Sequence, residues 1–237
     1  MVGKGKFLGK RTDLAWLRGV IAAVPIVLGY LPVGFAFGVL AQKAGLSIFH
    51  TLLMSVVVFA GSAQLIAVGL FAANLAPISI ILTTFIVNLR HLLFSAAIFP
   101  HIAEWRKGEL AGFAYELTDE TFALHTTRFQ MQAVEKGEAF AINLTSHLAW
   151  IIGSGLGAMT GHLVAEVEPF GLDYVLPAMF IALLVMQIKQ NSEVWAAVMG
   201  GLASVALSLL GLAQWHVIIG TVIGAAFGAW IGLWKKA

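Results

Sequence analysis

The chain has 237 residues, of which 59% are hydrophobic and 11% are charged, with a formal net charge of +2. Soluble domains are close to one quarter charged, so this composition excludes a soluble globular protein. It predicts an all-α, polytopic helical bundle in a membrane, because helices satisfy their own backbone groups in lipid. The absence of cysteine excludes disulfides and thiolate metal sites.

The basic residues gather at the chain ends. Five of the 14 Lys and Arg precede the first apolar run, and Lys235 and Lys236 close the chain. This placement predicts that both termini are cytoplasmic and argues against a nucleic-acid surface. The first apolar run is too long for a signal peptide, so we expect it to be a retained span.

Seven apolar runs are candidates for membrane crossing, since about 20 residues span the hydrocarbon core. In chain order they are Gly19–Ala41, Phe49–Ala72, Pro77–Phe99, Ala139–Leu163, Tyr174–Ile188, Val194–Leu212 and Trp215–Trp234. We expect one transmembrane domain over residues 1–237. It comprises a basic N-terminus (1–18), a half rich in polar motifs (19–130) and a glycine-rich half (139–237).

An odd number of crossings cannot leave both termini on one side. The more polar segment Gly112–Phe129 supplies an eighth crossing, so we predict about eight spans, seven strong and one polar. Its cost is that Arg106 and Lys107 then lie outside, against the usual charge bias. If Gly112–Phe129 is instead re-entrant or lies at the surface, a second segment must also fail to cross.

The flanking charges otherwise agree with eight spans. The acidic residues expected outside are Glu166, Glu168 and Asp173, and the basic residues expected inside are Arg128, Lys136 and Lys189.

Polar or helix-breaking residues lie about halfway along each of the first three runs, which indicates a site near the bilayer midplane. The candidate substrate-binding residues are Gly34, Phe35, Gly38, Gly61, Ser62, Gln64, Asn88, Arg90 and His91. A charge at this depth costs about 2.5–3.5 kcal/mol on insertion scales and needs a partner. The alternative for Arg90 is an early helix end that lets the side chain reach the headgroups.

Two of these motifs have structural alternatives. Pro32 can break the first helix and expose N–H groups that suit an anionic ligand, or it can give a kink beside small packing residues. The stretch with Gly61, Ser62 and Gln64 can do the same, or its side chains can bond neighbouring helices.

The acidic segment is the natural partner of Arg90. Glu116, Asp119 and Glu120 share one helical face, and we expect one of them to pair with Arg90 and another to carry a proton. A surface amphipathic helix would show the same spacing. His125 and His147 are weaker candidates, because a buried histidine is more often structural.

Glycine recurs every fourth residue in two helices, which predicts close helix packing within the subunit or against another one. The positions are Gly153, Gly157, Gly161, Gly220, Gly224, Gly228 and Gly232. Ser154 superficially suggests an intramembrane enzyme, yet no base lies at a supporting spacing. The segments Tyr30–Phe35 and Tyr174–Phe180 hint at a weak internal repeat. We expect no catalytic residues, cofactor or metal centre.

The motifs PVGFAFG, FAGSAQ, NLRH and ELTDETFAL follow one another between Pro32 and Leu124. In this order they resemble the AzlC-type (YgaZ-like) family of branched-chain amino acid permeases. The resemblance implies a large exporter subunit for valine, leucine or isoleucine in the bacterial cytoplasmic membrane. It also implies a small AzlD-type membrane partner.

We therefore expect a secondary exporter that works by alternating access around a midplane site and is driven by proton antiport. Phe35 would line the space for the aliphatic side chain of the substrate. The rivals are a permease subunit powered by a separate ATPase, a passive channel and an intramembrane enzyme. The chain carries no nucleotide-binding motif of its own.

Overall fold

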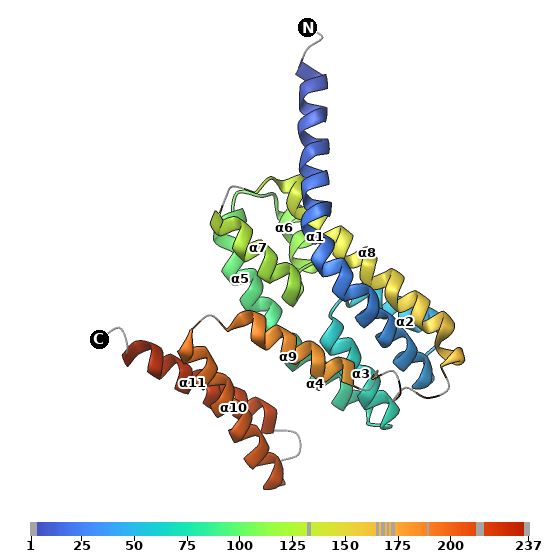
Figure 1. Cartoon of the computed structure of the whole chain (residues 1–237), viewed down its shortest axis with the longest axis vertical. Coiled ribbons are helices and arrows are strands. Elements are labelled where there is room, and N and C mark those ends of the chain that lie inside the picture. Colours follow the sequence, from blue (N-terminus) through green and yellow to red (C-terminus); the bar gives the residue numbers. More distant parts are fainter. Residues whose placement is uncertain are drawn as a thin grey trace. The chain divides into compact units, whose positions relative to one another are not determined.

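The structure is a computed structural model that describes residues 4–131, 134–164, 166, 169, 171, 174–188, 190–211 and 216–234. Side chains are described for these residues except 4–13, 176, 179, 180, 183, 186, 187, 217, 218, 233 and 234. Within this part every regular element is a helix, as the composition predicted. The chain forms two compact units, Met1–Pro177 and Ala178–Ala237 (Figure 1). The charges at Glu168, Asp173, Lys189, Lys235 and Lys236 lie outside the described residues.

Two long helices that run parallel to each other form the scaffold of the first unit (Figure 1). They are α1 (Lys4–Lys43) and α8 (Lys136–Thr160), which a short 3-10 turn (Gly161–Leu163) follows. A methyl group added at Gly157 would overlap Phe35 O, and one added at Gly153 would lie 2.6 Å from Leu31 O. The backbones can approach this closely only because glycine has no side chain. The predicted glycine packing is therefore confirmed as a contact within the subunit.

The expected break at Pro32 is absent. Helix α1 continues from Lys4 to Lys43 with both Pro25 and Pro32 inside it. Membrane helices tolerate proline where neighbouring helices support the backbone, and α8 lies along this stretch. The second interpretation, a proline beside small packing residues, describes α1.

The second apolar run folds into a helical hairpin, which we call hairpin one. It consists of α2 (Ile48–Val57) and α3 (Gly61–Ala72), joined at a tip around Phe59, whose backbone φ is +41°. The Gln64 side chain donates to Ser55 Oγ (3.4 Å), nine residues earlier. A continuous helix would separate these residues by about 13 Å, so α3 turns back alongside α2. Helix α3 then packs on the following helix (Figure 1).

The third apolar run is one nearly continuous span with an interruption at Leu89. Helix α4 (Pro77–Asn88) ends directly before it and α5 (Arg90–Ile102) begins directly after it. The Leu92 N–H donates to Leu89 O at 3.1 Å, so the helix tightens here into a three-residue turn.

The polar segment Gly112–Phe129 turns back within the unit, which is the re-entrant alternative for this segment. It forms hairpin two, made of α6 (Lys107–Tyr115) and α7 (Asp119–Met131). The start of α6 and the end of α7 both lie at the start of α8, because Lys136 pairs with Glu109 (2.6 Å) and Arg128 pairs with Glu138. Aromatic contacts between Phe113 and His125 (4.9 Å) hold the two helices side by side.

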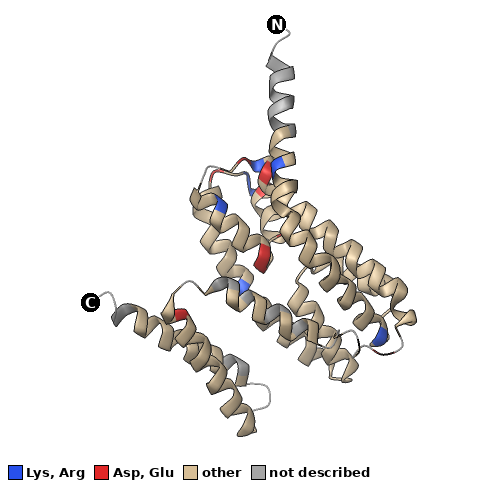
Figure 2. Cartoon of the chain, viewed as in Figure 1, with Lys and Arg blue, Asp and Glu red and all other residues tan. Residues whose placement is uncertain are grey.

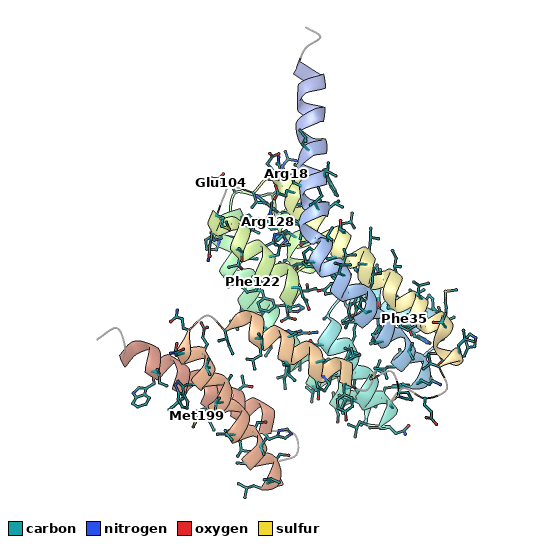
Figure 3. The ribbon with its side chains drawn as sticks, in the orientation of Figure 1. Arg18, Phe35, Glu104, Phe122, Arg128 and Met199 are labelled. Carbon is teal, nitrogen blue, oxygen red and sulfur yellow. The ribbon has the colours of Figure 1, made fainter. Side chains whose placement is uncertain are left out.

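We call this end of the unit the charged end, and Figure 2 shows Lys, Arg, Asp and Glu gathered there. Arg18 of α1 pairs with Glu135 (2.8 Å) and Glu138 (3.1 Å), and Figure 3 shows Arg18 and Arg128 in the same region. The hydrogen bond from Lys136 lowers the pKa of the exposed Glu109 carboxyl.

Two hairpins therefore enter the first unit from opposite ends. Hairpin two starts and finishes at the charged end, while hairpin one begins where α1 finishes, beyond Lys43. Hairpin one is the second segment that fails to cross, as the re-entrant alternative required. Arg106 and Lys107 now lie at the same end as Arg18, so the charge conflict of the eight-span prediction disappears.

The second unit contains the last two long helices and most of α9 (Val175–Gln187). Helices α10 (Asn191–Leu209) and α11 (His216–Trp234) pack closely at glycine positions. A methyl group at Gly224 would lie 2.6 Å from Ala196 O, whereas Gly232 has nothing within 4 Å. The glycine pattern of α11 thus also serves packing within the chain, except at Gly232.

The hairpin fold of residues 107–131 predicts that both of its outer ends face the same side of the membrane. The chain has no cysteine, so Lys107→Cys and Gln130→Cys each introduce a single thiol at an exposed position. An impermeant maleimide should label both from the same side of oriented vesicles. Leu163→Cys, which is 73% exposed beyond α8, should react from the opposite side. Labelling of positions 107 and 130 from opposite sides would restore the crossing segment and contradict the hairpin.

Candidate functional site

The tips of both hairpins meet halfway along the α1–α8 scaffold. Tyr30 of α1 lies 12 residues after Arg18 and 13 before Lys43, which places it about 18 Å and about 20 Å from these residues along the helix. The Tyr30 hydroxyl donates to Glu120 Oε2 (2.5 Å) and lies 2.6 Å from Thr118 Oγ1, so hairpin two reaches this level. The Phe59 ring of hairpin one lies 6.3 Å from the Tyr30 ring.

Arg90 connects three helices at this level. Its Nη2 atom lies 2.9 Å from Asp119 Oδ2 and also donates to Ser62 Oγ. Arg90 begins α5, Ser62 lies in the first turn of α3, and Asp119 begins α7. The predicted pairing of Arg90 with a carboxylate of the acidic segment is present, and Asp119 is the partner. The Asp119 side chain is only 10% exposed, so the pair is largely removed from solvent.

Two helix N-termini converge on this pair, and each favours negative charge. Helix α3 starts after Ala60, which gives no side-chain cap, so its first N–H groups lack an intrahelical acceptor. Helix α7 is capped by Thr118, whose Oγ1 accepts from Thr121 N (3.3 Å), and carries Asp119 and Glu120 in its first turn. A guanidinium beside the N-terminus of α3 forms a site that attracts an anion.

Further polar contacts join the hairpin tips to each other and to α8. The Tyr115 hydroxyl at the end of α6 donates to Val56 O at the end of α2. His147 of α8 lies 2.9 Å from Ser55 O, and its other ring nitrogen lies 3.0–3.1 Å from the two Glu116 carboxylate oxygens. Of the three acidic candidates, Asp119 pairs with Arg90, Glu120 with Tyr30 and Glu116 with His147.

Several buried polar atoms at the α4–α5 junction have no hydrogen-bond partner. They are Asn88 Oδ1, Arg90 Nε and His91 Nε2. Buried polar atoms are normally bonded, so this unpartnered cluster is a candidate place for a polar ligand to bind. The His91 ring stacks on Phe94 (5.7 Å), and Phe94 stacks on Phe122 of α7 (4.4 Å), so an aromatic surface lies one turn beyond the ion pair.

Other residues that we predicted to bind substrate are in packing contacts. Gly34 and Gly38 face the backbone of α8, and Phe35 lies where Gly157 approaches α1. Gly61 lies against the Trp150 ring. Gln64 accepts from Trp150 Nε1 (3.1 Å) and from Ala60 N (3.2 Å), so it organises the tip of hairpin one. Figure 3 shows Phe35 well apart from Phe122.

The sequence points only weakly to two residues of this site, Tyr30 and His147. Tyr30 lies two residues before the PVGFAFG motif and is an ordinary aromatic residue by hydropathy. His147 lies in an apolar helix whose dominant signal is glycine spacing. No sequence periodicity could show that Tyr30 bonds Glu120 or that His147 bonds Glu116. Ser154, the candidate nucleophile, lies 2.8 Å from Ser55 Oγ and donates to Ile151 O, as a packing serine does.

Comparison with known proteins gives one consistent result. Residues 25–164 match the family model described as AzlC protein. The chain is 32% identical over 224 residues to an uncharacterized membrane protein of Archaeoglobus fulgidus, covering 91% of this chain and 94% of that protein. It is 30% identical over 230 residues to the inner membrane protein YgaZ of Escherichia coli, covering 94% and 93%.

The chain is also 30% identical over 190 residues to the branched-chain amino acid transport protein AzlC of Bacillus subtilis, covering 79% of this chain and 74% of that protein. No solved structure shows a significant match.

The buried ion pair predicts strong energetic coupling between Arg90 and Asp119. Removing one partner leaves an uncompensated buried charge. The losses of unfolding free energy in Arg90→Ala and Asp119→Ala should therefore sum to more than the loss in the double variant. We expect a coupling energy of about 1–3 kcal/mol from denaturation of the four-member cycle in detergent. The more exposed pair Glu109–Lys136 is the control and should give less than about 1 kcal/mol. Equal coupling in the two pairs would contradict burial of Arg90 and Asp119.

Proposed function

The chain belongs to the AzlC family, and we propose that it exports branched-chain amino acids as the large subunit of a two-component secondary transporter. It is an all-α membrane protein, and one of its relatives is named a branched-chain amino acid transport protein. The observation that carries the proposal is the Arg90–Asp119 pair at the meeting point of two hairpin tips. A polar centre at this depth needs a function or a partner to offset its cost in lipid.

The site offers groups complementary to each part of the substrate. The carboxylate of an amino acid would bind Arg90 and the free N–H groups at the start of α3, where Arg90 Nε has no protein partner. The ammonium would face the acidic residues of hairpin two and the Asn88 Oδ1 atom. The stacked rings of Phe94 and Phe122 would contact the branched aliphatic side chain.

Binding of the substrate carboxylate has a consequence for Asp119. When the substrate carboxylate binds the Arg90 guanidinium, Asp119 loses its partner in a poorly solvated environment. Asp119 must then bind the substrate ammonium or accept a proton, because a lone buried carboxylate is unfavourable. The substrate ammonium and a proton are alternatives at Asp119, so substrate and proton compete for this carboxylate, and such competition supports proton antiport as the energy source.

The two hairpins suit alternating access. Each tip ends at mid-depth, so exposing the site to one side requires movement of one hairpin rather than of a whole crossing helix. Hairpin two is tied to α1 and α8 at the charged end through Glu138, which is 2% exposed and bonds both Arg18 and Arg128. Opening toward that end would break these contacts.

The distribution of charge supports a cytoplasmic location for the charged end, since basic residues favour that side. With two hairpins that do not cross, the expected crossings are α1, α4–α5, α8, α9, α10 and α11. This even number agrees with both termini in the cytoplasm. We propose that the membrane is the inner membrane of a bacterial cell. We propose a small AzlD-type subunit as the partner.

The test is flux of radiolabelled valine in proteoliposomes under an imposed pH difference, with and without the small subunit. Arg90→Ala and Asp119→Ala should each reduce uphill flux about 200–5000-fold, because removing one partner of a buried ion pair costs about 3–5 kcal/mol. The double variant should regain stability and remain inactive. Lys107→Ala and Glu104→Ala, at exposed positions, are the matched controls.

Normal flux in both single variants would remove the proposed site. Flux that requires ATP and ignores a protonophore would favour the rival with a separate ATPase. Flux that never exceeds the equilibrium distribution would favour a passive channel.

A further inference from the structure

We propose that His147 and Glu116 share one exchangeable proton, and that this proton competes with the substrate ammonium for Glu116. The inference rests on the proposed function and names the group that couples substrate to proton. His147 lies in α8, is 6% exposed and contacts both hairpins. Its Nε2 lies 2.9 Å from Ser55 O in hairpin one, and its Nδ1 lies 3.0–3.1 Å from the Glu116 carboxylate in hairpin two.

The partners fix how many protons the pair holds. A backbone carbonyl only accepts, so the proton on Nε2 is needed for the bond to Ser55 O. An ionised carboxylate also only accepts, so the contact between Nδ1 and Glu116 requires a further proton on one of the two groups. Imidazolium with carboxylate, or imidazole with carboxylic acid, satisfies the geometry equally. Without that proton, two lone pairs would face each other at about hydrogen-bond distance.

The surroundings make this pair distinct from the other two acidic contacts. Asp119 is held by a guanidinium that stays charged, and Glu120 by a tyrosine hydroxyl that already carries its own proton. Only Glu116 is paired with an imidazole, whose two ring nitrogens can each carry a proton. The Phe59 ring stacks on His147 at 3.9 Å between ring centres and fixes the plane of the imidazole.

The titratable and charged groups that face this position from the packed elements are few among the described residues. The Tyr115 ring of α6 lies 6.2 Å from the His147 ring, and the other such groups at the level of the hairpin tips are Tyr30, Arg90, His91, Asp119 and Glu120. Arg90 and Asp119 offset each other, and the two tyrosines are neutral below pH 9.

The proton has a mechanical consequence as well. When it is present, His147 ties the tip of hairpin two to hairpin one through α8. When it leaves, Glu116 loses this bond and becomes an ionised carboxylate at the site, ready to bind the substrate ammonium. Proton and substrate therefore bind Glu116 alternately, which is the requirement for an antiporter.

The experiment measures valine binding to the purified full chain, with its small subunit where needed, between pH 5 and pH 8. Competition by one proton predicts that the valine Kd rises up to tenfold for each unit of pH decrease in the acidic part of this range. Valine binding should also release close to one proton in weakly buffered solution. His147→Gln should show no rise of the valine Kd over this range and release no proton, whatever its affinity at pH 8. His125→Gln, another buried histidine of this unit, should behave like the unchanged protein.

A second variant covers the case in which His147→Gln does not fold. Glu116→Gln places an amide N–H against His147 Nδ1 and removes the carboxylate that can be protonated, so it should weaken valine binding and abolish proton release. A flat pH profile in the unchanged protein, or an unchanged slope in either variant, would overturn the shared proton. Those outcomes leave valine binding intact, whereas failure of the proposed function would show as no valine binding at all.

Discussion

An arginine deep in a lipid-embedded helical bundle must be neutralised there, and the first unit is arranged around that constraint. Arg90 is met by an aspartate from α7 and a serine from α3, which come from opposite ends of the unit. Two hairpins that stop halfway bring polar groups to this depth without a fully polar crossing helix. The interruption of three neighbouring segments at one level follows from the same need, because each interruption frees backbone or side-chain groups for the site.

The glycine contact between α1 and α8 provides the rigid frame for this arrangement. Close approach of the two backbones positions Tyr30 and His147 on adjacent helices, where each bonds an acidic residue of hairpin two. The left-handed backbone conformation of Phe59 costs about 1–3 kcal/mol. The stacking of its ring on His147 helps to offset this cost. Frame, tips and charged centre therefore depend on one another.

Much of this could be predicted from the sequence. Hydropathy found the helices, the four-residue spacing of glycine indicated their close packing, and the cost of Arg90 in lipid demanded a carboxylate from the acidic segment. Hydropathy does not show, however, whether a segment crosses the membrane or folds back to the side from which it entered. A segment of 18 residues such as Gly112–Phe129 is compatible with either. The hairpin depends on Lys136 and Glu109 meeting, which is a tertiary contact.

Two other features were beyond the sequence for similar reasons. The effect of Pro32 depends on whether a neighbouring helix supports the backbone, and α8 does so more than 100 residues later in the chain. The importance of His147 depends on Ser55 and Glu116, which are 92 and 31 residues away. Local patterns identify which residues need partners, and the fold decides which partners they find.

The most direct test of the central claim is cross-linking of the two hairpin tips in intact membranes. Val56→Cys and Tyr115→Cys place thiols at exposed tip positions in a chain that has no other cysteine. A short bifunctional thiosulfonate should join them, while the pair Val56→Cys and Lys107→Cys, about 12 Å further along α6, should stay unlinked. Failure of the first pair to link although each thiol reacts singly, or equal linking of both pairs, would contradict tips that meet at Arg90.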